Sequence, residues 1–213
     1  MSVEEDKKDT RQRLLESAAI IFTEKGYANT SVAEICERAG ANIAAVNYYF
    51  RSKDALYREV LEFTIEQAEK TYPFTLLAEE PAEERLYHFI LALLQRILSA
   101  EMAGNFYVLV AKEMAEPTLA SGEIVSQSIA RHQSLMREVI REICHAEVDD
   151  DLLLRLHFSV LSQCLFISYN EKGRRHHLQR NPIQFKDAEV FARHIADFSL
   201  AGMRRCCSLS GLS

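Results

Sequence analysis

The sequence has few of the residues that interrupt helices. Among its 213 residues are 7 Gly, 4 Pro and no Trp, and it contains no long alternating run rich in β-branched residues. Strand-rich proteins need such runs and frequent turn residues, so these absences favour an all-α fold. Because 48% of the residues are hydrophobic, disorder over most of the chain is also disfavoured.

Long apolar runs are absent too. No stretch approaches the roughly 20 apolar residues that a membrane-spanning helix needs. The first residues, MSVEEDKKDTRQR, are charged throughout and lack the apolar core of a signal peptide. We therefore expect a cytoplasmic protein without a membrane partner.

The sequence also lacks the spacings that mark metal centres and catalytic sites. Its cysteines are odd in number and show no CxxC…CxxC pattern; they are Cys36, Cys144, Cys164, Cys206 and Cys207. In the cytosol we expect reduced, mostly buried thiols. No nucleophile–base pair or phosphate-binding loop stands out. We expect no metal, no cofactor and no catalytic residue.

Strong positive charge is missing as well. The formal net charge is −6, which argues against a protein that coats DNA non-specifically. Residues 10–60 hold 7 basic and 6 acidic side chains, so this segment is nearly neutral. Such a balance suits selective DNA binding with few phosphate contacts.

Residues 30–56, TSVAEICERAGANIAAVNYYFRSKDAL, carry the most specific pattern. Ser31 can cap one helix, with Glu34 completing a capping box. Gly40 permits a sharp turn, and Asn42 can cap the next helix. This arrangement is typical of a helix-turn-helix, which places its second helix in the DNA major groove.

Within that second helix, Val46, Tyr49 and Phe50 share one side and should pack on the preceding helices. The remaining residues face elsewhere. Together with the caps and the start of the following helix they form the expected DNA-contacting set, namely Thr30, Ser31, Asn42, Ile43, Ala44, Ala45, Asn47, Tyr48 and Lys53.

The chemistry of these side chains suggests distinct roles. Asn47 can pair with adenine, and Tyr48 can reach a phosphate or a thymine methyl group. Lys53 can bind a phosphate together with backbone N–H groups. Plainer alternatives are an exposed Asn, a half-buried core Tyr and a solvated Lys. Thr30 and Ser31 could serve only as caps.

The rest of the chain reads as amphipathic helices. We expect a flexible tail over residues 1–9, the helix-turn-helix domain over 10–57, and an effector-binding and dimerisation domain over 58–213. The helix near residues 152–167 is apolar on more than one side, and the last helix carries a second apolar stripe. Two such helices from each of two subunits can form a four-helix dimer interface.

These helices could enclose a largely apolar pocket with a few polar groups. The alternative for every candidate is a place in an ordinary core. The candidate ligand contacts are His88, Phe89, Asn105, Phe106, Tyr107, His132, Met136, His157, Gln163, Phe166 and Tyr169.

The segment GYANTSVAEICERAGANIAAVNYYFRSKDALY resembles the N-terminal signature of the TetR/AcrR family of transcriptional regulators. The shared pattern covers roughly residues 10–57. It includes a Thr-Ser helix start, an Ile-x-x-x-Ala-Gly turn and a Tyr-Phe-x-Ser-Lys-x-x-Leu run. YVLVAKEMAEPT and FSVLSQCLFISYN look like parts of the CecR-type C-terminal domain within that family.

The resemblance implies an all-α homodimer that joins through its last two helices. It also implies a palindromic operator and a small-molecule effector that changes DNA affinity, most often for repression. The chain departs from the family pattern in having Asn47 where Tyr is frequent and Asn42 as the cap. Operator sequence therefore does not carry over. A DNA-binding architectural protein without an effector and an all-α enzyme remain the alternatives.

Overall fold

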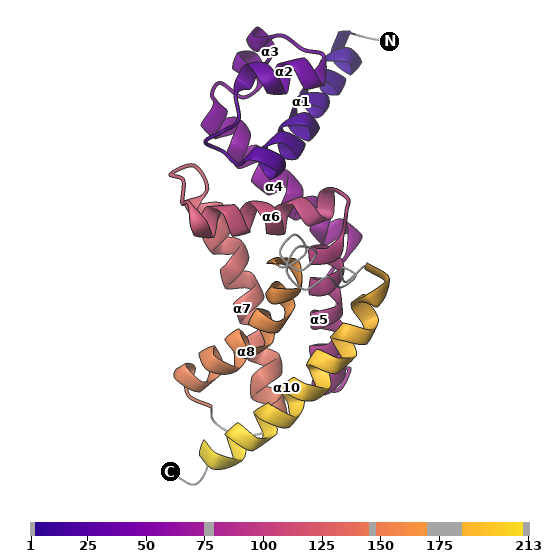
Figure 1. Cartoon of the computed structure of the whole chain (residues 1–213), viewed down its shortest axis with the longest axis vertical. Helices are drawn as coiled ribbons and strands as arrows, with labels where there is room; N and C mark the ends of the chain where they lie inside the picture. The colour runs from indigo at the N-terminus through magenta and orange to yellow at the C-terminus, as the bar shows by residue number, and fades with distance from the viewer. Residues whose placement is uncertain (1–2, 75–78, 145–147, 170–184, 211–213) are drawn as a thin grey trace, which may run out of the picture. The chain divides into compact units, whose positions relative to one another are not determined.

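The computed structural model describes residues 3–74, 79–144, 148–169 and 185–210, and every regular element among them is helical (Figure 1). Side chains are described for residues 9–74, 79–144, 148–167 and 186–208. The expected all-α fold is confirmed. The chain forms two compact units, which we treat separately. Unit 1 holds residues 1–71 and 100–128, and unit 2 holds residues 72–99 and 129–213.

Unit 1 contains five complete helices. They are α1 (Val3–Lys25), α2 (Val32–Ala39), α3 (Ile43–Tyr49), α4 (Lys53–Thr71) and α6 (Met102–Ala115). Helix α4 packs against both α1 and α6, and α1 also packs against α2. Because α1 begins at Val3, the backbone that we expected to be a flexible tail is largely helical.

The caps read from the sequence hold α2 and α3 in place. The Ser31 hydroxyl accepts a hydrogen bond from the Glu34 amide at 3.2 Å, and Gly40 ends α2 in the left-handed region with φ 62°. The Asn42 side chain then accepts from the Ala45 amide at 2.9 Å. The Glu34 carboxylate bonds Lys25, which the capping-box reading did not predict.

A buried carboxylate joins three segments of unit 1. Glu113 of α6 accepts a 2.7 Å hydrogen bond from the Tyr57 hydroxyl of α4. It also accepts from the Thr118 amide at 2.9 Å and from the hydroxyls of Thr118 and Ser121. Burial and the Glu113 hydrogen bond raise the pKa of Tyr57, so this phenol stays protonated as a donor.

Unit 2 is built from α5 (Ala82–Leu98), α8 (Asp150–Tyr169), α10 (Ala188–Ser210) and most of α7 (Gly122–Cys144). A short 3₁₀ helix, η1 (Phe185–Asp187), precedes α10. Helix α5 packs against α8 and α10.

Ion pairs also join α10 to α5. Arg193 pairs with Glu84, and Arg204 pairs with Glu83 at 3.0 Å. The Arg193 guanidinium lies 3.7 Å from the centre of the Tyr87 ring.

The cysteines correct one expectation. Cys144 at the end of α7 and Cys207 of α10 form a disulfide with their sulfur atoms 2.04 Å apart, whereas we expected reduced thiols. The pair is 63 residues apart in sequence, so its spacing gave no signal. Cys36 and Cys164 are buried free thiols, and Cys206 is a partly buried one.

The division between units also differs from the boundary expected after residue 57. Helix α4 continues to Thr71, and α6 belongs with it because the two helices pack together and share the Tyr57–Glu113 hydrogen bond. In the described part of the chain, no helix has both the length and the hydropathy that a membrane crossing requires.

Candidate functional site

Helix α3 presents an exposed face made of residues predicted from the sequence. Ile43, Ala44, Asn47 and Tyr48 are exposed, and 68% of Tyr48 is accessible. Ala45 is partly buried. The opposite side is held by Val46 and Phe50, which are buried as expected, while Tyr49 is partly buried. The fold therefore leaves one face of α3 available to a partner.

Lys53 is positioned by an aromatic ring. It is the first residue of α4, and its Nζ lies 4.3 Å from the centre of the Tyr27 ring. Ser52 caps the same helix by accepting from the Ala55 amide at 3.1 Å. Partial burial lowers the pKa of Lys53. This packing holds the ammonium group beside the exposed N-terminus of α4.

Tyr27 was missed by the sequence analysis. Its hydroxyl donates to the Asp54 carboxylate, which together with burial raises the pKa of Tyr27 to about 12. Its ring also packs against Phe22 and Tyr57. The available signal was its place directly after Gly26, within the segment that carries the family resemblance.

Two of the predicted contacts serve as caps, and one is buried. Ser31 and Asn42 are exposed N-caps, as expected. Thr30 differs from the expectation, because it is buried and its hydroxyl donates to the Gly26 carbonyl at 2.7 Å. That hydroxyl stabilises the turn after α1 and does not face a partner.

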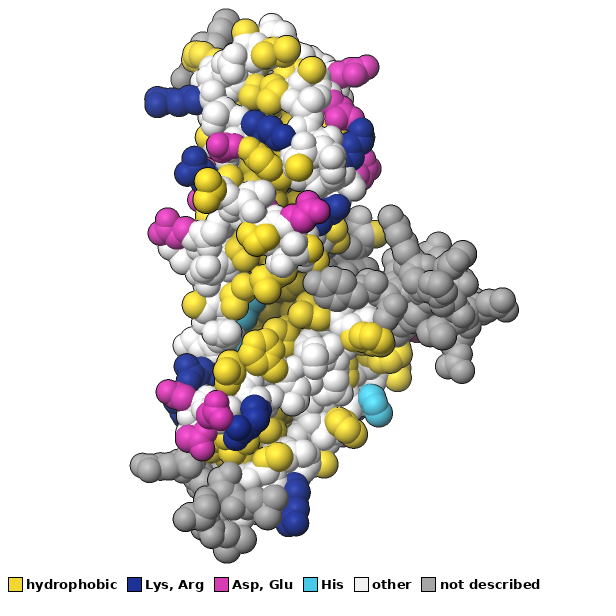
Figure 2. Space-filling model, turned by 60° about the vertical axis from the view of Figure 1, so that its left-hand side comes forward, with side chains coloured by type: hydrophobic (Ala, Val, Ile, Leu, Met, Phe, Trp, Pro, Cys, Tyr) yellow, Lys and Arg dark blue, Asp and Glu magenta, His cyan; other side chains and the backbone are white. Residues whose placement is uncertain are grey.

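The surface around these residues carries mixed charge. On the face drawn in Figure 2, the N-terminal part at the top shows Lys and Arg side chains scattered among uncharged and acidic ones. Lys25 is paired with Glu34, and Arg11 is paired with Glu59. These pairs reduce the charge available for non-specific attraction to phosphate.

Unit 2 contains a buried cluster around Arg96 of α5. Only 2% of this arginine is exposed, and its guanidinium stacks 3.8 Å from the centre of the Phe74 ring. Its Nε donates to the Tyr72 carbonyl at 2.8 Å. Phe74 stacks on Phe89 and meets His132 edge to face, with ring centres 4.7 and 4.8 Å apart.

The imidazoles of this cluster are neutral at physiological pH. Burial, followed by the charges of Arg96 and Arg131, lowers the pKa of His132 from 6.5 to about 4. His157 of α8 is 4% exposed, and burial lowers its pKa as well. The Nδ1 atom of His157 is buried without a hydrogen-bond partner.

The candidate ligand residues therefore separate into groups. Phe89, His132, Met136 and His157 lie in unit 2 and are largely buried, whereas Asn105, Phe106 and Tyr107 lie on α6 of unit 1.

Three other candidates lie elsewhere in unit 2. His88 bonds Glu80 at 2.9 Å, Gln163 bonds the Ser159 carbonyl, and 65% of Phe166 is exposed. The side chain of Tyr169 lies outside the described residues.

The sequence analysis also missed Arg96 and Phe74. Arg96 follows Leu93 and Phe89 at helical spacing on an otherwise apolar stripe, and that lone cation was the available signal.

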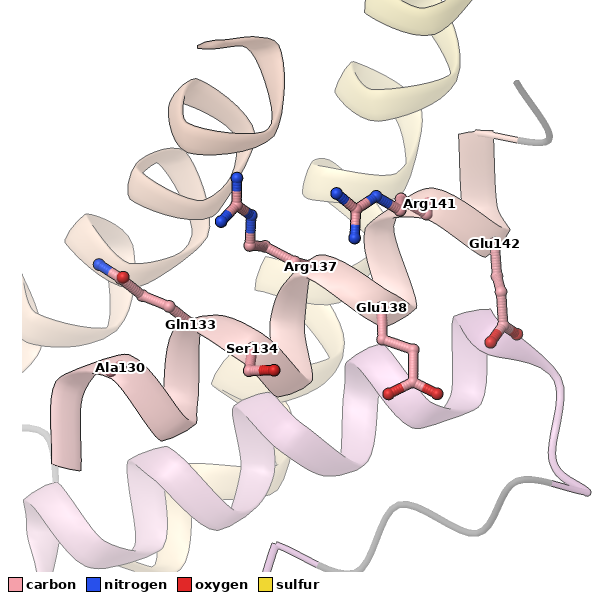
Figure 3. A pocket seen from close by; sticks show the side chains of 7 residues that line it. All are labelled: Ala130, Gln133, Ser134, Arg137, Glu138, Arg141 and Glu142. Atoms are coloured by element: carbon pink, nitrogen blue, oxygen red, sulfur yellow. The ribbon is translucent and has the colours of Figure 1, made fainter. Parts of the chain in front are cut away.

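Open hollows occur elsewhere on unit 2. Figure 3 shows one of about 560 Å³ whose lining side chains all project from α7. Three of its charged groups have ion-pair partners, because Arg137 and Arg141 pair with Asp150 and Glu142 pairs with Arg85. This hollow is therefore a charged surface groove.

A more apolar groove of about 420 Å³ lies between α8 and α10. It is lined by Phe166, Ile167, Phe191 and Ile195 among others. Around it the two helices expose further apolar side chains, including Phe198, which is 67% accessible. Exposed aromatic side chains in this number are unusual on a surface that faces only water.

Comparison with known proteins accounts for both parts of the chain. A family model described as "Bacterial regulatory proteins, tetR family" matches residues 14–60. A second, "HTH-type transcriptional dual regulator CecR, C-terminal domain", matches residues 82–203 and so covers more than half of the chain. The chain belongs to the TetR family of transcriptional regulators. The resemblance read from the sequence is thereby confirmed, including the CecR-type C-terminal domain.

Individual members of the family are distant relatives. The HTH-type transcriptional repressor NicS of Pseudomonas putida (strain KT2440) is 25% identical over 205 residues, which are 92% of this chain and 93% of NicS. A Bacillus subtilis (strain 168) protein named "Probable HTH-type transcriptional regulator YttP" is 25% identical over 64% of this chain and 65% of its own length.

A solved structure shares the fold. AibR, crystallised in complex with isovaleryl coenzyme A and operator DNA, aligns over 90% of this chain and 96% of its own with a TM-score of 0.66. At 14% sequence identity, this likeness concerns the fold alone.

Proposed function

We propose that this TetR-family regulator is a repressor. In this proposal it binds a palindromic operator as a homodimer and is released from the operator by a small-molecule effector. The observation that carries the proposal is the outward face of α3. Ile43, Ala44, Asn47 and Tyr48 are exposed there, beside the helix start where Tyr27 positions Lys53.

The proposed DNA-contacting residues have two roles, base recognition and phosphate binding. Asn47 offers a donor and an acceptor to a base edge in the major groove, and Ile43 and Ala44 offer apolar contact. Tyr48 reaches a phosphate or a thymine methyl group. Lys53 and the free amides at the start of α4 bind a phosphate, because a helix N-terminus attracts negative charge.

A second copy of the chain is the proposed occupant of the groove between α8 and α10. Phe166 and Phe198 are mostly exposed, and Ile167 and Ile195 lie beneath them in an apolar surface. Pairing α8 and α10 with the same helices of another subunit would bury these side chains in a four-helix interface. The two subunits would then present their α3 helices to half-sites about 34–36 Å apart.

The effector is proposed to act by population shift. A ligand that binds one arrangement of the dimer more tightly lowers operator affinity by its differential affinity. NicS is named a repressor, and AibR was solved with both a small molecule and operator DNA. The proposal assigns the same two kinds of partner, operator DNA and a small molecule, to this chain.

Footprinting of the purified protein on DNA upstream of its own gene tests the proposal. We expect a protected palindrome and a dimer by sedimentation. Asn47→Ala should weaken binding by about 1–3 kcal/mol and relax the preference at one base position. A loss of equal size on all DNA sequences would show that Asn47 only positions the protein.

Lys53→Ala should weaken binding on all sequences and reduce the salt slope by about one unit. Lys70→Ala is a matched control, because Lys70 is an exposed lysine near the other end of the same helix. An unprotected upstream region, or equal effects of the two lysine substitutions, would contradict the proposed surface.

A further inference from the structure

Arg96 is a buried cation whose charge no acidic group in the described residues neutralises. Its Nη2 atom is buried and has no hydrogen-bond partner. Its guanidinium donates to the Tyr72 carbonyl and lies over the face of Phe74. A buried charge without a counter-ion costs several kcal/mol, so an arginine in this state is usually paired or binds an anion.

The other buried arginine of α5 shows what a structural role looks like. Arg85 is 4% exposed, and its Nη2 donates to the Glu142 carboxylate of α7. Both arginines lie on the same helix and in the same unit. Arg85 also keeps one buried donor without a partner, its Nε, but its charge is neutralised by Glu142, whereas Arg96 has no acidic partner among the described residues.

Polar groups from two more helices lie near Arg96. The charge of Arg96 helps to lower the pKa of His132 of α7, and His132 meets the ring of Phe74 that covers the guanidinium. His157 of α8 has the second open polar atom, its buried Nδ1. The interior of unit 2 thus holds an unsatisfied polar atom on α5 and another on α8, and both residues act electrostatically on His132 of α7.

We propose that Arg96 binds the carboxylate of a small, apolar, monoanionic effector. The planar guanidinium fork matches the two oxygens of a carboxylate. In this proposal His157 supplies a second hydrogen bond through its open Nδ1, and the stacked rings of Phe74 and Phe89 supply apolar contact for the rest of the molecule.

The charge of the effector follows from the charge of the site. Arg96 contributes one buried positive charge, and the neutral imidazole of His132 contributes none at physiological pH. Arg131, whose charge also acts on His132, is exposed to solvent. A carboxylate neutralises the site, whereas a phosphate monoester would leave about one uncompensated negative charge in a buried place. A monoanion is therefore the better match.

His157 also connects this cluster with the surface. It lines a cleft of about 350 Å³ between α7 and α8, whose other lining residues are Gln133, Arg137, Asp150, Asp151, Leu153 and Leu154. Gln133 directly follows His132 in the chain. The cleft therefore reaches one side of His157, while its Nδ1 atom is buried.

This inference names the effector class for the proposed function and rests on it for regulation. Binding itself is tested without DNA, by titration calorimetry of the full-length protein with benzoate and octanoate. The neutral matches are benzamide and octanamide, and phenyl phosphate is the dianionic probe. We expect each carboxylate to bind at least about tenfold more tightly than its amide, and benzoate more tightly than phenyl phosphate.

Substitutions test whether carboxylate binding depends on Arg96 itself or on the general integrity of the fold. Arg96→Met should remove the preference for the carboxylate, and Arg96→Lys should keep part of it because the charge remains. Arg85→Met is the matched control and should bind within about twofold of wild type. Equal affinity for acid and amide, tighter binding of phenyl phosphate, or unchanged carboxylate binding by Arg96→Met would overturn the assignment.

A second measurement distinguishes this inference from the proposed function. Carboxylate binding that depends on Arg96 but leaves operator affinity unchanged would support the site and contradict release by effector. Operator release by a compound that binds equally well to Arg96→Met would support effector control and contradict the role of Arg96.

Discussion

Glu113 in unit 1 and Arg96 in unit 2 are both buried charges on helices, but their surroundings differ. Glu113 accepts hydrogen bonds from Tyr57, Thr118 and Ser121. Among the described residues, the side chain of Arg96 makes one hydrogen bond, to the Tyr72 carbonyl, and its Nη2 atom has no partner. One carboxylate is surrounded by donors, while one guanidinium lacks an acidic acceptor among the described residues.

The difference separates a structural charge from a binding charge. A buried ion is tolerated when hydrogen bonds replace its lost hydration, as they do for Glu113. Where they do not, the fold carries a cost that a ligand of opposite charge would remove. Burial of a charged residue is therefore not by itself a sign of function. A buried charge indicates a binding role when its polar atoms lack partners within the protein.

Of the substitutions that test this comparison, Glu113→Ala should have the largest effect on the free energy of unfolding. The substitution leaves the buried Tyr57 hydroxyl and the Thr118 amide without an acceptor, so we expect a loss of about 4 kcal/mol in the free energy of unfolding. Urea denaturation measures it. Met114→Ala is the control, because Met114 is the next residue of α6 and is 68% exposed. A loss below about 1 kcal/mol would mean that Glu113 does not hold the unit together.

The pH dependence of stability tests the surroundings of Arg96 in unit 2, through its neighbour His132. The pKa of His132 falls from 6.5 to about 4 on folding, first through burial and then through the charge of Arg96. The folded state favours the neutral form of His132. The contribution of His132 to the free energy of unfolding is therefore fully present above pH 6.5 and is lost as the pH falls towards 4. The shift corresponds to about 3 kcal/mol.

The measurement compares the wild type with His132→Gln at several pH values, so that the carboxylates common to both proteins cancel. We expect the wild type to lose about 3 kcal/mol relative to the variant between pH 7 and pH 4. Parallel curves would show that His132 does not have a lowered pKa, and Arg96 would then lose one of its neutral neighbours.

The sequence predicted the features that depend on neighbouring residues. Ser31, Gly40 and Asn42 act within three or four positions along the chain, and each caps a helix as expected. The buried side of α3 also follows from spacing, since Val46 and Phe50 fall on it. Local hydrogen bonds and periodicity are readable because the helix geometry fixes them.

Features that depend on distant residues were not predictable in the same way. The Tyr57–Glu113 bond spans 56 positions and the Cys144–Cys207 bond spans 63, so no local pattern marks them. Thr30 was predicted to contact DNA because its type suited phosphate, but the turn uses its hydroxyl. Whether a polar group is satisfied depends on the tertiary fold.

Arg96→Met should have the smallest effect on stability, and the opposite sign to Glu113→Ala. Without ligand, replacing an unpaired buried cation with an apolar side chain of similar length should raise the free energy of unfolding by about 1–2 kcal/mol. Arg85→Met should not do so, because it breaks the pair with Glu142. Thermal unfolding of the two variants without ligand measures the contrast.

If both substitutions destabilise the protein equally, Arg96 is a structural charge like Glu113, and the comparison between the two units fails. If only Arg96→Met stabilises it, the wild-type residue is kept at a cost to stability, which is the pattern expected of a residue retained for binding.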